Sequence, residues 1–195
     1  MDVIIVAGGR GKRMGGVDKA AVTVNGERLI DHLLDEVSVL DALQQVVVVS
    51  GRNLEVRPGV KVTAEDPPFS GPVAGILAGM EELREAAAER TAVLAVDAPE
   101  SATLIPELNE ALDESGADVA VIREEGGHLQ PLCAVWHTES LWLALNELGD
   151  AANKPAKALV GAAGSVTELA GTGEERDYDT LEELAALGEY ELPEQ

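Results

Sequence analysis

The chain of 195 residues carries a formal net charge of -22, with 46% hydrophobic but only 3% aromatic residues. Its length predicts one domain with a sizeable core, and its aliphatic content is too high for a disordered acidic chain. Nucleic-acid binding is also disfavoured, because a surface with 36 acidic and 14 basic residues repels phosphate groups.

The first half of the chain alternates aliphatic runs with helical patterns. The Val- and Ile-rich runs predict three strands, at 2–7, 45–50 and 60–64. Apolar residues recur at three- and four-residue spacing in 28–40 and 71–90, which predicts amphipathic helices. In the second helix, Pro72 lies near the N-terminus, where its missing N–H costs nothing.

The same alternation continues through the second half. Three further strands are predicted, at 91–96, 117–122 and 129–136. Helical patterns follow at 102–115 and 138–148. Strands that alternate with helices are typical of an open sheet covered on both faces. We therefore expect a single-domain, three-layer α/β/α, Rossmann-like fold with a mostly parallel sheet.

The C-terminal part is expected to contain a short strand at 166–169 and a short helix at 179–187. Thr180 and Glu183 have the spacing of a capping box at the start of this helix. The remaining residues are acidic and are expected to fray. The predicted organisation is a domain at 1–187 followed by an acidic tail at 188–195.

Ligands of open α/β sheets bind beyond the C-terminal ends of the strands. Two features follow strands here: Asp97, and the glycine-rich segment "AGGRGKRMGGVDKA" at 7–20. The glycines can expose backbone N–H groups to an anion. Four cations gather in this segment of an otherwise acidic chain: Arg10, Lys12, Arg13 and Lys19. An anion-binding loop is favoured over a merely solvated one.

Two standard phosphate-binding patterns do not fit this segment. A Walker A loop needs Ser or Thr after a Gly-Lys pair, and none follows one here. The dinucleotide fingerprint would begin at Gly9 and Gly11, but Met14 stands at the third glycine.

Instead, the segment resembles the signature of nucleotidyltransferases of the sugar-nucleotide type. Within that superfamily, the chain is most similar to molybdenum cofactor guanylyltransferases. Three later segments match in order: "EDPPFSGPVAGI" at 65–76, "AVDAP" at 95–99 and "HLQPLCAVW" at 128–136. The matches run from residue 3 to about 186. The resemblance implies a nucleotidyltransferase fold and transfer of GMP from GTP to the phosphate of molybdopterin, which yields a guanine dinucleotide and pyrophosphate.

The resemblance also implies roles for particular residues. Four positions at the end of the first strand and just beyond it would hold the nucleotide through their backbone: Val6, Ala7, Gly8 and Gly9. Arg13 and Lys19 would neutralise the triphosphate, Asp66 would bind the nucleotide, and Asp97 would hold a Mg²⁺ cofactor. A helix cap remains the alternative for Asp97, and an ordinary loop carboxylate for Asp66.

The acceptor side is less defined by the sequence. Gln130 and Pro131 are candidates to face the pterin, and Gly71 and Gly75 could present helix N–H groups to an anion. Relatives often carry an aromatic residue after the "DAP" segment, but here Glu100 follows it. The family's Asn- and Pro-containing close is replaced by "RDYDTLEEL" at 176–184, which weakens the assignment of the acceptor.

Three other functions therefore stay open. An adenosylcobinamide-phosphate guanylyltransferase shares a very similar opening motif. A cytidylyltransferase for methylerythritol phosphate, or a sugar-phosphate nucleotidyltransferase, ranks below it. A non-catalytic nucleotide-binding regulator belongs to a different class, but the presence of Lys19 and Asp97 favours an enzyme.

The remaining expectations concern the surroundings of the protein. A single Cys133 excludes an intramolecular disulfide, and the start lacks a basic n-region, so we expect a reduced, cytoplasmic protein. No apolar stretch approaches the roughly 18 residues that span a bilayer. The acidic, lysine-poor composition is typical of a high-salt habitat and favours a halophilic archaeon. Expected partners are GTP and molybdopterin, with transient contacts to molybdenum-cofactor assembly proteins or apo-molybdoenzymes.

Overall fold

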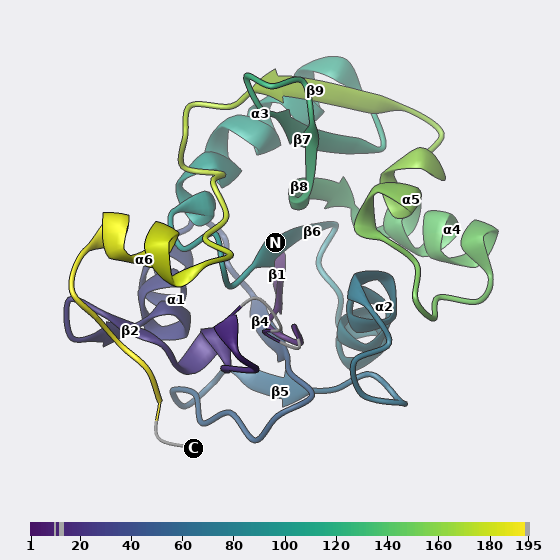
Figure 1. Cartoon of the computed structure of the whole chain (residues 1–195). Coiled ribbons are helices and arrows are strands. Elements are labelled where there is room, and N and C mark those ends of the chain that lie inside the picture. Colours follow the sequence, from purple (N-terminus) through teal and green to yellow (C-terminus); the bar gives the residue numbers. More distant parts are fainter. Residues whose placement is uncertain (10, 12–13, 194–195) are drawn as a thin grey trace.

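A central β-sheet organises the computed structural model, which describes residues 1–9, 11 and 14–193 (Figure 1). In this part of the chain the sheet has seven strands in the order β5-β4-β1-β6-β8-β7-β9. Their bounds are β1 Asp2–Val6, β4 Gln45–Val49, β5 Lys61–Thr63, β6 Arg90–Ala95, β7 Val119–Arg123, β8 Leu129–His137 and β9 Val166–Ala170.

Strand directions confirm the mostly parallel sheet. The strands β5, β4, β1 and β6 run parallel to one another, and β7 and β9 form a second parallel pair. Only β8 among the strands of this described sheet runs the other way, antiparallel to both β6 and β7. The C-terminal ends of β4, β1 and β6 therefore meet at one edge, together with the start of β8.

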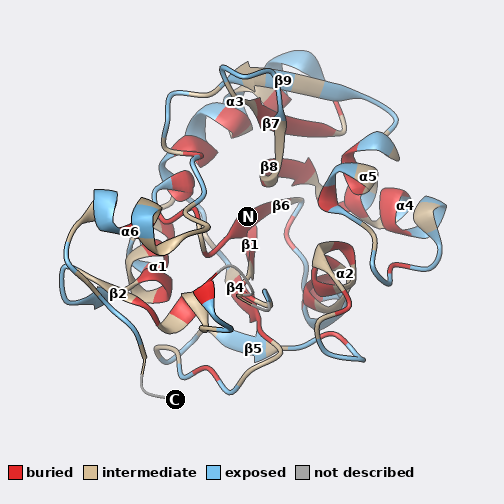
Figure 2. Cartoon of the chain, viewed as in Figure 1, coloured by how far each residue is buried: buried red, intermediate tan, exposed pale blue. Residues whose placement is uncertain are grey.

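Helices cover both faces of the sheet (Figure 1). One face carries α1 Leu29–Ser38, η3 Ser101–Leu104, α3 Ile105–Ser115 and α6 Leu181–Leu187. The other carries α2 Pro72–Leu83, α4 Thr138–Leu148 and α5 Ala156–Gly161. Figure 2 shows the buried residues concentrated in the strands and on the sheet-facing sides of the helices. The predicted three-layer α/β/α fold is confirmed.

The strand β1 explains why the N-terminal run is apolar without alternation. Val3 and Ile5 belong to the core on the face that carries α1 and α3, while Ile4 packs beneath α2 on the opposite face. All three side chains are fully buried. A strand covered on both faces has no solvent side, so every position favours an aliphatic residue.

The contact between α2 and β1 depends on Gly79. A Cβ added at this glycine would lie 2.8 Å from Cγ2 of Ile4. We expect Gly79→Ala to lower the free energy of unfolding by about 1–3 kcal/mol, because a packed core tolerates extra volume poorly. Urea denaturation measures the change. Gly161→Ala is the matched control, since a Cβ at the end of α5 would meet nothing within 4 Å. If Gly79→Ala leaves the free energy of unfolding unchanged, the close packing of α2 on β1 is contradicted.

Both predicted helix starts are confirmed. Pro72 is the first residue of α2. At α6, Thr180 Oγ1 accepts a hydrogen bond from Glu183 N at 3.2 Å, and Glu183 Oε2 accepts one from Thr180 N at 2.9 Å. The helix α5 and the 3-10 turn η2 at Lys19–Ala21 were not predicted.

A small second sheet corrects the expectation for the tail. The strands β2 Thr23–Val24 and β3 Glu27–Arg28 form a hairpin, and β10 Tyr190–Glu191 pairs with β2. Residues after 187 were expected to fray, but this pairing and the Asn25 N–H bond to Glu189 O at 2.7 Å hold them against the N-terminal part of the chain. Glu194 and Gln195 lie outside the described residues.

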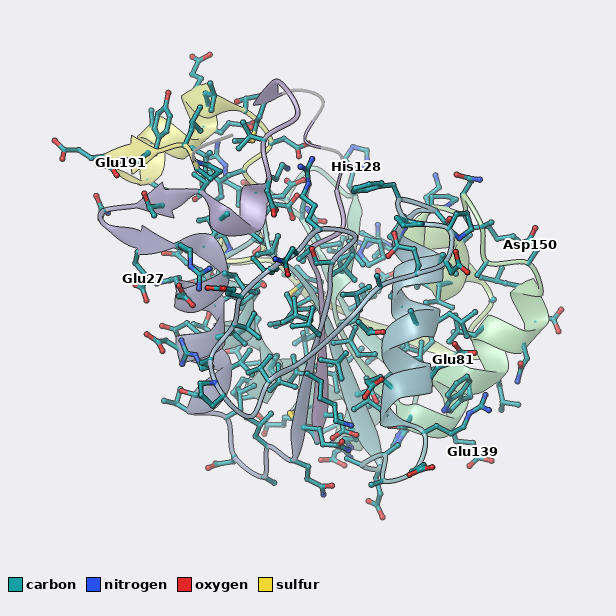
Figure 3. All side chains as sticks on the ribbon, turned by 90° about the horizontal axis from the view of Figure 1, so that it is seen from below. Glu27, Glu81, His128, Glu139, Asp150 and Glu191 are labelled. Carbon is teal, nitrogen blue, oxygen red and sulfur yellow. The ribbon has the colours of Figure 1, made fainter. Side chains whose placement is uncertain are left out.

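Acidic side chains occupy the periphery of the molecule. Figure 3 shows Glu27, Glu139, Asp150 and Glu191 at its outer edges, and all four are exposed. Within the described ranges, no helix combines the length and the apolar content needed to cross a membrane.

Candidate active site

A cavity of about 510 Å³ opens at the C-terminal ends of β1, β4 and β6. It is bounded by the glycine loop, the start of α2 and the segments that follow β5 and β6. Its lining includes six of the residues predicted from the sequence to bind nucleotide or metal: Val6, Ala7, Gly8, Gly9, Lys19 and Asp97. The fold therefore brings these residues together, whereas the predicted Arg13, like Arg10 and Lys12, lies outside the described residues.

The glycine loop turns sharply at Gly11. This residue has a φ of +58°, and a Cβ there would lie 2.0 Å from Val17 O. Its carbonyl accepts hydrogen bonds from Met14 N at 2.9 Å and Gly16 N at 2.8 Å. Met14, which breaks the dinucleotide fingerprint, is 3% exposed. The Met14 side chain therefore anchors the loop in the core, while Gly8, Gly9 and Gly11 line the cavity.

Arg52 also stabilises this loop, and the sequence did not predict this role. Its Nη2 donates to Gly16 O at 2.9 Å, and its guanidinium carbon lies 5.9 Å from the centroid of the Phe69 ring. Phe69 lines the cavity. The guanidinium thus connects the glycine loop to the segment that follows β5.

Lys19 joins three distant parts of the chain at the cavity. Its ammonium donates to Asp97 Oδ2 at 2.8 Å and also to Asp179 Oδ1. The Lys19 side chain is 14% exposed, and those of Asp97 and Asp179 are 25% and 31% exposed. The N-cap of the next helical segment is Glu100, without a side-chain hydrogen bond, so Asp97 does not cap it. Asp179 also lines the cavity and becomes a site residue that had been noted only as part of an altered motif.

The electrostatics keep this lysine charged. Burial lowers the pKa of Lys19, but attraction and hydrogen bonds from Asp97 and Asp179 outweigh it, so the net pKa is raised. Burial also raises the pKa of Asp177, and repulsion from Asp97 and Asp179 adds to the effect. The Lys19 ammonium thus lies between the carboxylates of Asp97 and Asp179 at this end of the cavity.

The start of α2 forms another wall of the cavity. Gly71, with a φ of +95°, precedes the helix, and Gly71, Pro72 and Gly75 all line the cavity. The backbone of Asn153 lies 3.4 Å from a Cβ placed on Gly71. The N-terminus of this 12-residue helix directs its positive end to the cavity, as expected for a site that receives anions.

The comparison with protein families decides the classification. The model of the MobA-like NTP transferase domain matches residues 3–166. The chain belongs to this family.

Individual relatives agree with this membership. The chain is 33% identical over 165 residues to a protein of Pseudomonas entomophila named molybdenum cofactor guanylyltransferase, with 82% of each chain covered. Its fold is similar to that of molybdopterin-guanine dinucleotide biosynthesis protein A from Archaeoglobus fulgidus, with a TM-score of 0.70, 21% identity and 96% of each chain covered. It is also similar to 4-diphosphocytidyl-2C-methyl-D-erythritol synthase from Anaerococcus prevotii, with a TM-score of 0.67, 13% identity, and 95% and 93% covered.

In this MobA-like NTP transferase domain, two neighbouring acidic residues occupy different environments. Asp66, the predicted nucleotide-binding aspartate, is exposed and is absent from the described residues that line the cavity. Glu65 is 6% exposed and lines it. The Asp66–Pro67 peptide bond is cis. The sequence motif predicted a site at this segment, and the structure shows that Glu65, not the predicted Asp66, lines the cavity.

Neither of the two residues predicted to face the pterin, Gln130 and Pro131, is among the described residues that line the cavity. Leu132 at the start of β8 lines the cavity, whereas Gln130 Nε2 donates to Glu124 Oε1 in the preceding hairpin. Pro131 is absent from the described cavity lining.

The described residues provide neither a reactive cysteine nor a preformed metal-binding cluster. Burial raises the pKa of the Cys133 thiol to about 12, so it is protonated and a poor nucleophile near neutral pH. Among the described residues, no group of three or more His, Cys, Asp or Glu side chains is already arranged around a metal position.

Proposed function

We propose that the chain is a Mg²⁺-dependent molybdenum cofactor guanylyltransferase, which transfers GMP from GTP to the phosphate of molybdopterin. The observation that carries this proposal is the meeting of Lys19 and Asp97 beside the glycine loop in one cavity. The curated relative with 33% identity supports the same acceptor and nucleotide. The fold alone would not identify the acceptor or the nucleotide, because it also occurs in a diphosphocytidyl-methylerythritol synthase.

The proposed reaction joins two anions. An oxygen of the molybdopterin phosphate attacks the α-phosphorus of GTP, a new P–O bond forms, and the bond from the α-phosphorus to the bridging oxygen breaks. Pyrophosphate carries away the electron pair. No protein nucleophile is required, so the chain contributes mainly position and charge.

Particular groups of the chain supply these contributions. The exposed backbone after β1 binds the nucleotide, and the N-terminus of α2 favours negative charge nearby. The Lys19 ammonium neutralises phosphate charge that grows on the leaving group. The loop anchors Met14 and Arg52 keep the backbone of the glycine loop in place before the substrate arrives.

The donor set at the end of β6 fits Mg²⁺. Asp97 and Asp179 both line the cavity and present carboxylate oxygens, which this ion prefers. Asp97, with Asp179 beside it, would hold the ion. When bound, Mg²⁺ would neutralise phosphate oxygens and help to align the triphosphate.

A substrate panel tests the proposed function. The purified chain is incubated with Mg²⁺, with GTP, ATP or CTP, and with molybdopterin or adenosylcobinamide phosphate, and pyrophosphate release is measured. We expect release only with GTP and molybdopterin, and we expect removal of Mg²⁺ with EDTA to abolish it. Release with GTP and adenosylcobinamide phosphate would instead identify the alternative acceptor, and release with CTP would remove the guanylyltransferase assignment.

The proposal also gives the reaction a setting. We place it in the cytoplasm, where a buried, unpaired Cys133 is compatible with reducing conditions. Transient contact with molybdenum-cofactor assembly proteins or apo-molybdoenzymes would deliver the acceptor and collect the product.

A further inference from the structure

Besides Asp97 and Asp179, a third carboxylate lines the same cavity, that of Glu65, and the proposed chemistry does not use it. Glu65 Oε1 accepts a hydrogen bond from Phe69 N at 2.9 Å. Its other oxygen, Oε2, is buried and has no hydrogen-bond partner among the described residues. A buried acceptor without a partner is costly, so this oxygen is poised for a donor that the described residues do not provide.

The position of Glu65 directs this unused oxygen toward a nucleotide. The residue lines the cavity, and a Cβ on Gly8 would lie 3.5 Å and 3.7 Å from its two oxygens. The carboxylate therefore faces the backbone of the glycine loop. Because the terminal torsion of a glutamate is broad, a small rotation presents Oε2 to a ligand in the cavity.

Glu65 and Asp97 are separated along the edge of the sheet. Glu65 follows β5 and Asp97 follows β6, with β4 and β1 between these strands. Three strand spacings of about 4.8 Å separate the backbones at the ends of β5 and β6 by about 14 Å, but the Glu65 side chain reaches back to Gly8 at the end of β1. A triphosphate beside Lys19 and Asp97 would leave the rest of the nucleotide to extend across the glycine loop, where the Glu65 carboxylate lies.

We propose that Glu65 is the residue that selects guanine. This inference rests on the proposed function and adds its base specificity. Guanine presents two adjacent donors, N1–H and the 2-amino group, which match the oxygens of one carboxylate. Adenine and cytosine place a ring-nitrogen acceptor beside their amino group, and uracil has one N–H between two carbonyls. Against these bases the buried carboxylate would stay unpaired or face a lone pair.

Phe69 strengthens this assignment. Its N–H fixes one oxygen of Glu65, and its ring lines the same cavity below the guanidinium of Arg52. The hydrogen bond from Phe69 N thus anchors Oε1 before any ligand binds, while Oε2 can still turn toward the ligand. A preorganised acceptor of this kind discriminates better than a mobile surface carboxylate.

Equilibrium binding without any acceptor substrate tests the inference. Titration calorimetry with Mg²⁺ compares GTP with inosine triphosphate, which lacks only the 2-amino group, and with ATP. We expect the wild-type chain to bind GTP at least about tenfold more tightly than inosine triphosphate. Glu65→Gln should bring this ratio to within about twofold. Glu65→Asp keeps the charge but withdraws the carboxylate by about 1.5 Å, and it should also reduce the ratio.

Two further variants make the experiment specific. Glu81→Gln removes the same charge from an exposed position on α2, labelled in Figure 3, and should leave the ratio unchanged. Asp66→Asn tests the exposed neighbour. If Asp66→Asn removes the discrimination and Glu65→Gln does not, the inference is overturned. The thermal midpoint of each variant shows that it is folded.

Other outcomes separate the inference from the proposed function. A wild-type ratio near one overturns the inference even if no Glu65 variant folds. In another outcome, Glu65→Gln keeps the preference for GTP over inosine triphosphate but loses a preference for GTP over 2′-deoxy-GTP. This result would place Glu65 at the ribose, and it also overturns the inference. Pyrophosphate release from GTP and molybdopterin would then leave the proposed function intact. Conversely, a Glu65-dependent ratio without any transfer to molybdopterin would remove the proposed acceptor alone.

Discussion

Asp97→Asn is expected to lower the rate of pyrophosphate release from GTP by about 100- to 1000-fold while the chain remains folded. The amide keeps the size of the side chain and can still accept a hydrogen bond from Lys19, which now lies 2.8 Å from Oδ2. It loses the negative charge that would hold Mg²⁺ beside the phosphates. Preorganised charge at a reacting centre contributes effects of this size. Steady-state kinetics at saturating GTP and a range of Mg²⁺ concentrations measure the loss.

Asp113→Asn is the matched control for this experiment. Asp113 also pairs with a cation, Arg90, but its side chain is 62% exposed, and an exposed pair contributes little to stability. We expect its turnover to equal that of the wild type. A turnover near the wild-type value for Asp97→Asn would remove the proposed metal ligand. Partial recovery at high Mg²⁺ would support the proposal, because a weaker site can be filled by mass action.

Lys19→Ala is expected to have an equally large effect, through a different cause. It removes the ammonium that the proposed mechanism places beside the leaving phosphates, so kcat/KM should fall by about 100- to 1000-fold. It also removes the ammonium that Asp97 and Asp179 both contact, so repulsion among Asp97, Asp177 and Asp179 should lower the thermal midpoint. Steady-state kinetics and thermal unfolding measure the two effects.

A double variant separates these two losses. In Lys19→Ala with Asp179→Asn, one of the repelling charges is gone, so the thermal midpoint should recover while kcat/KM stays low. Lys61→Ala provides the control, since Lys61 pairs with Glu82 only at the surface, at 3.4 Å. Recovery of activity in the double variant would show that Lys19 acts through stability and not on the phosphates.

The strands and helices were predictable where local sequence determines burial. The run that became β1 is apolar because both of its faces are covered, and this pattern is visible without a structure. The capping box of α6 is likewise a local signal, carried by Thr180 and Glu183. The hairpin of β2 and β3 was missed, although its Asn25–Gly26 turn is a recognised hairpin signal.

The site was predictable in part, because a motif identifies candidate residues but does not show which way their side chains point. The glycine loop and Asp97 were expected at one edge of the sheet, and their meeting in one cavity follows from the strand order. The contact of Lys19 with Asp179 spans 160 positions of the chain and depends on where the C-terminal segment folds back. Likewise, the choice between Glu65 and Asp66 depends on the path of the loop after β5, which composition does not encode.

The reversed direction of β8 divides the cavity into parts that can evolve separately. The glycine loop, Glu65 and Asp97 all follow the C-terminal ends of parallel strands, whereas Leu132 enters the cavity from the beginning of an antiparallel one. The turn before β8, at 124–128, therefore lies in a hairpin that carries none of the groups proposed to hold the nucleotide. Substitutions or insertions in this turn can reshape the wall beside the acceptor while GTP binding stays constant. A single nucleotide-binding half could thus serve relatives that act on different phosphate acceptors.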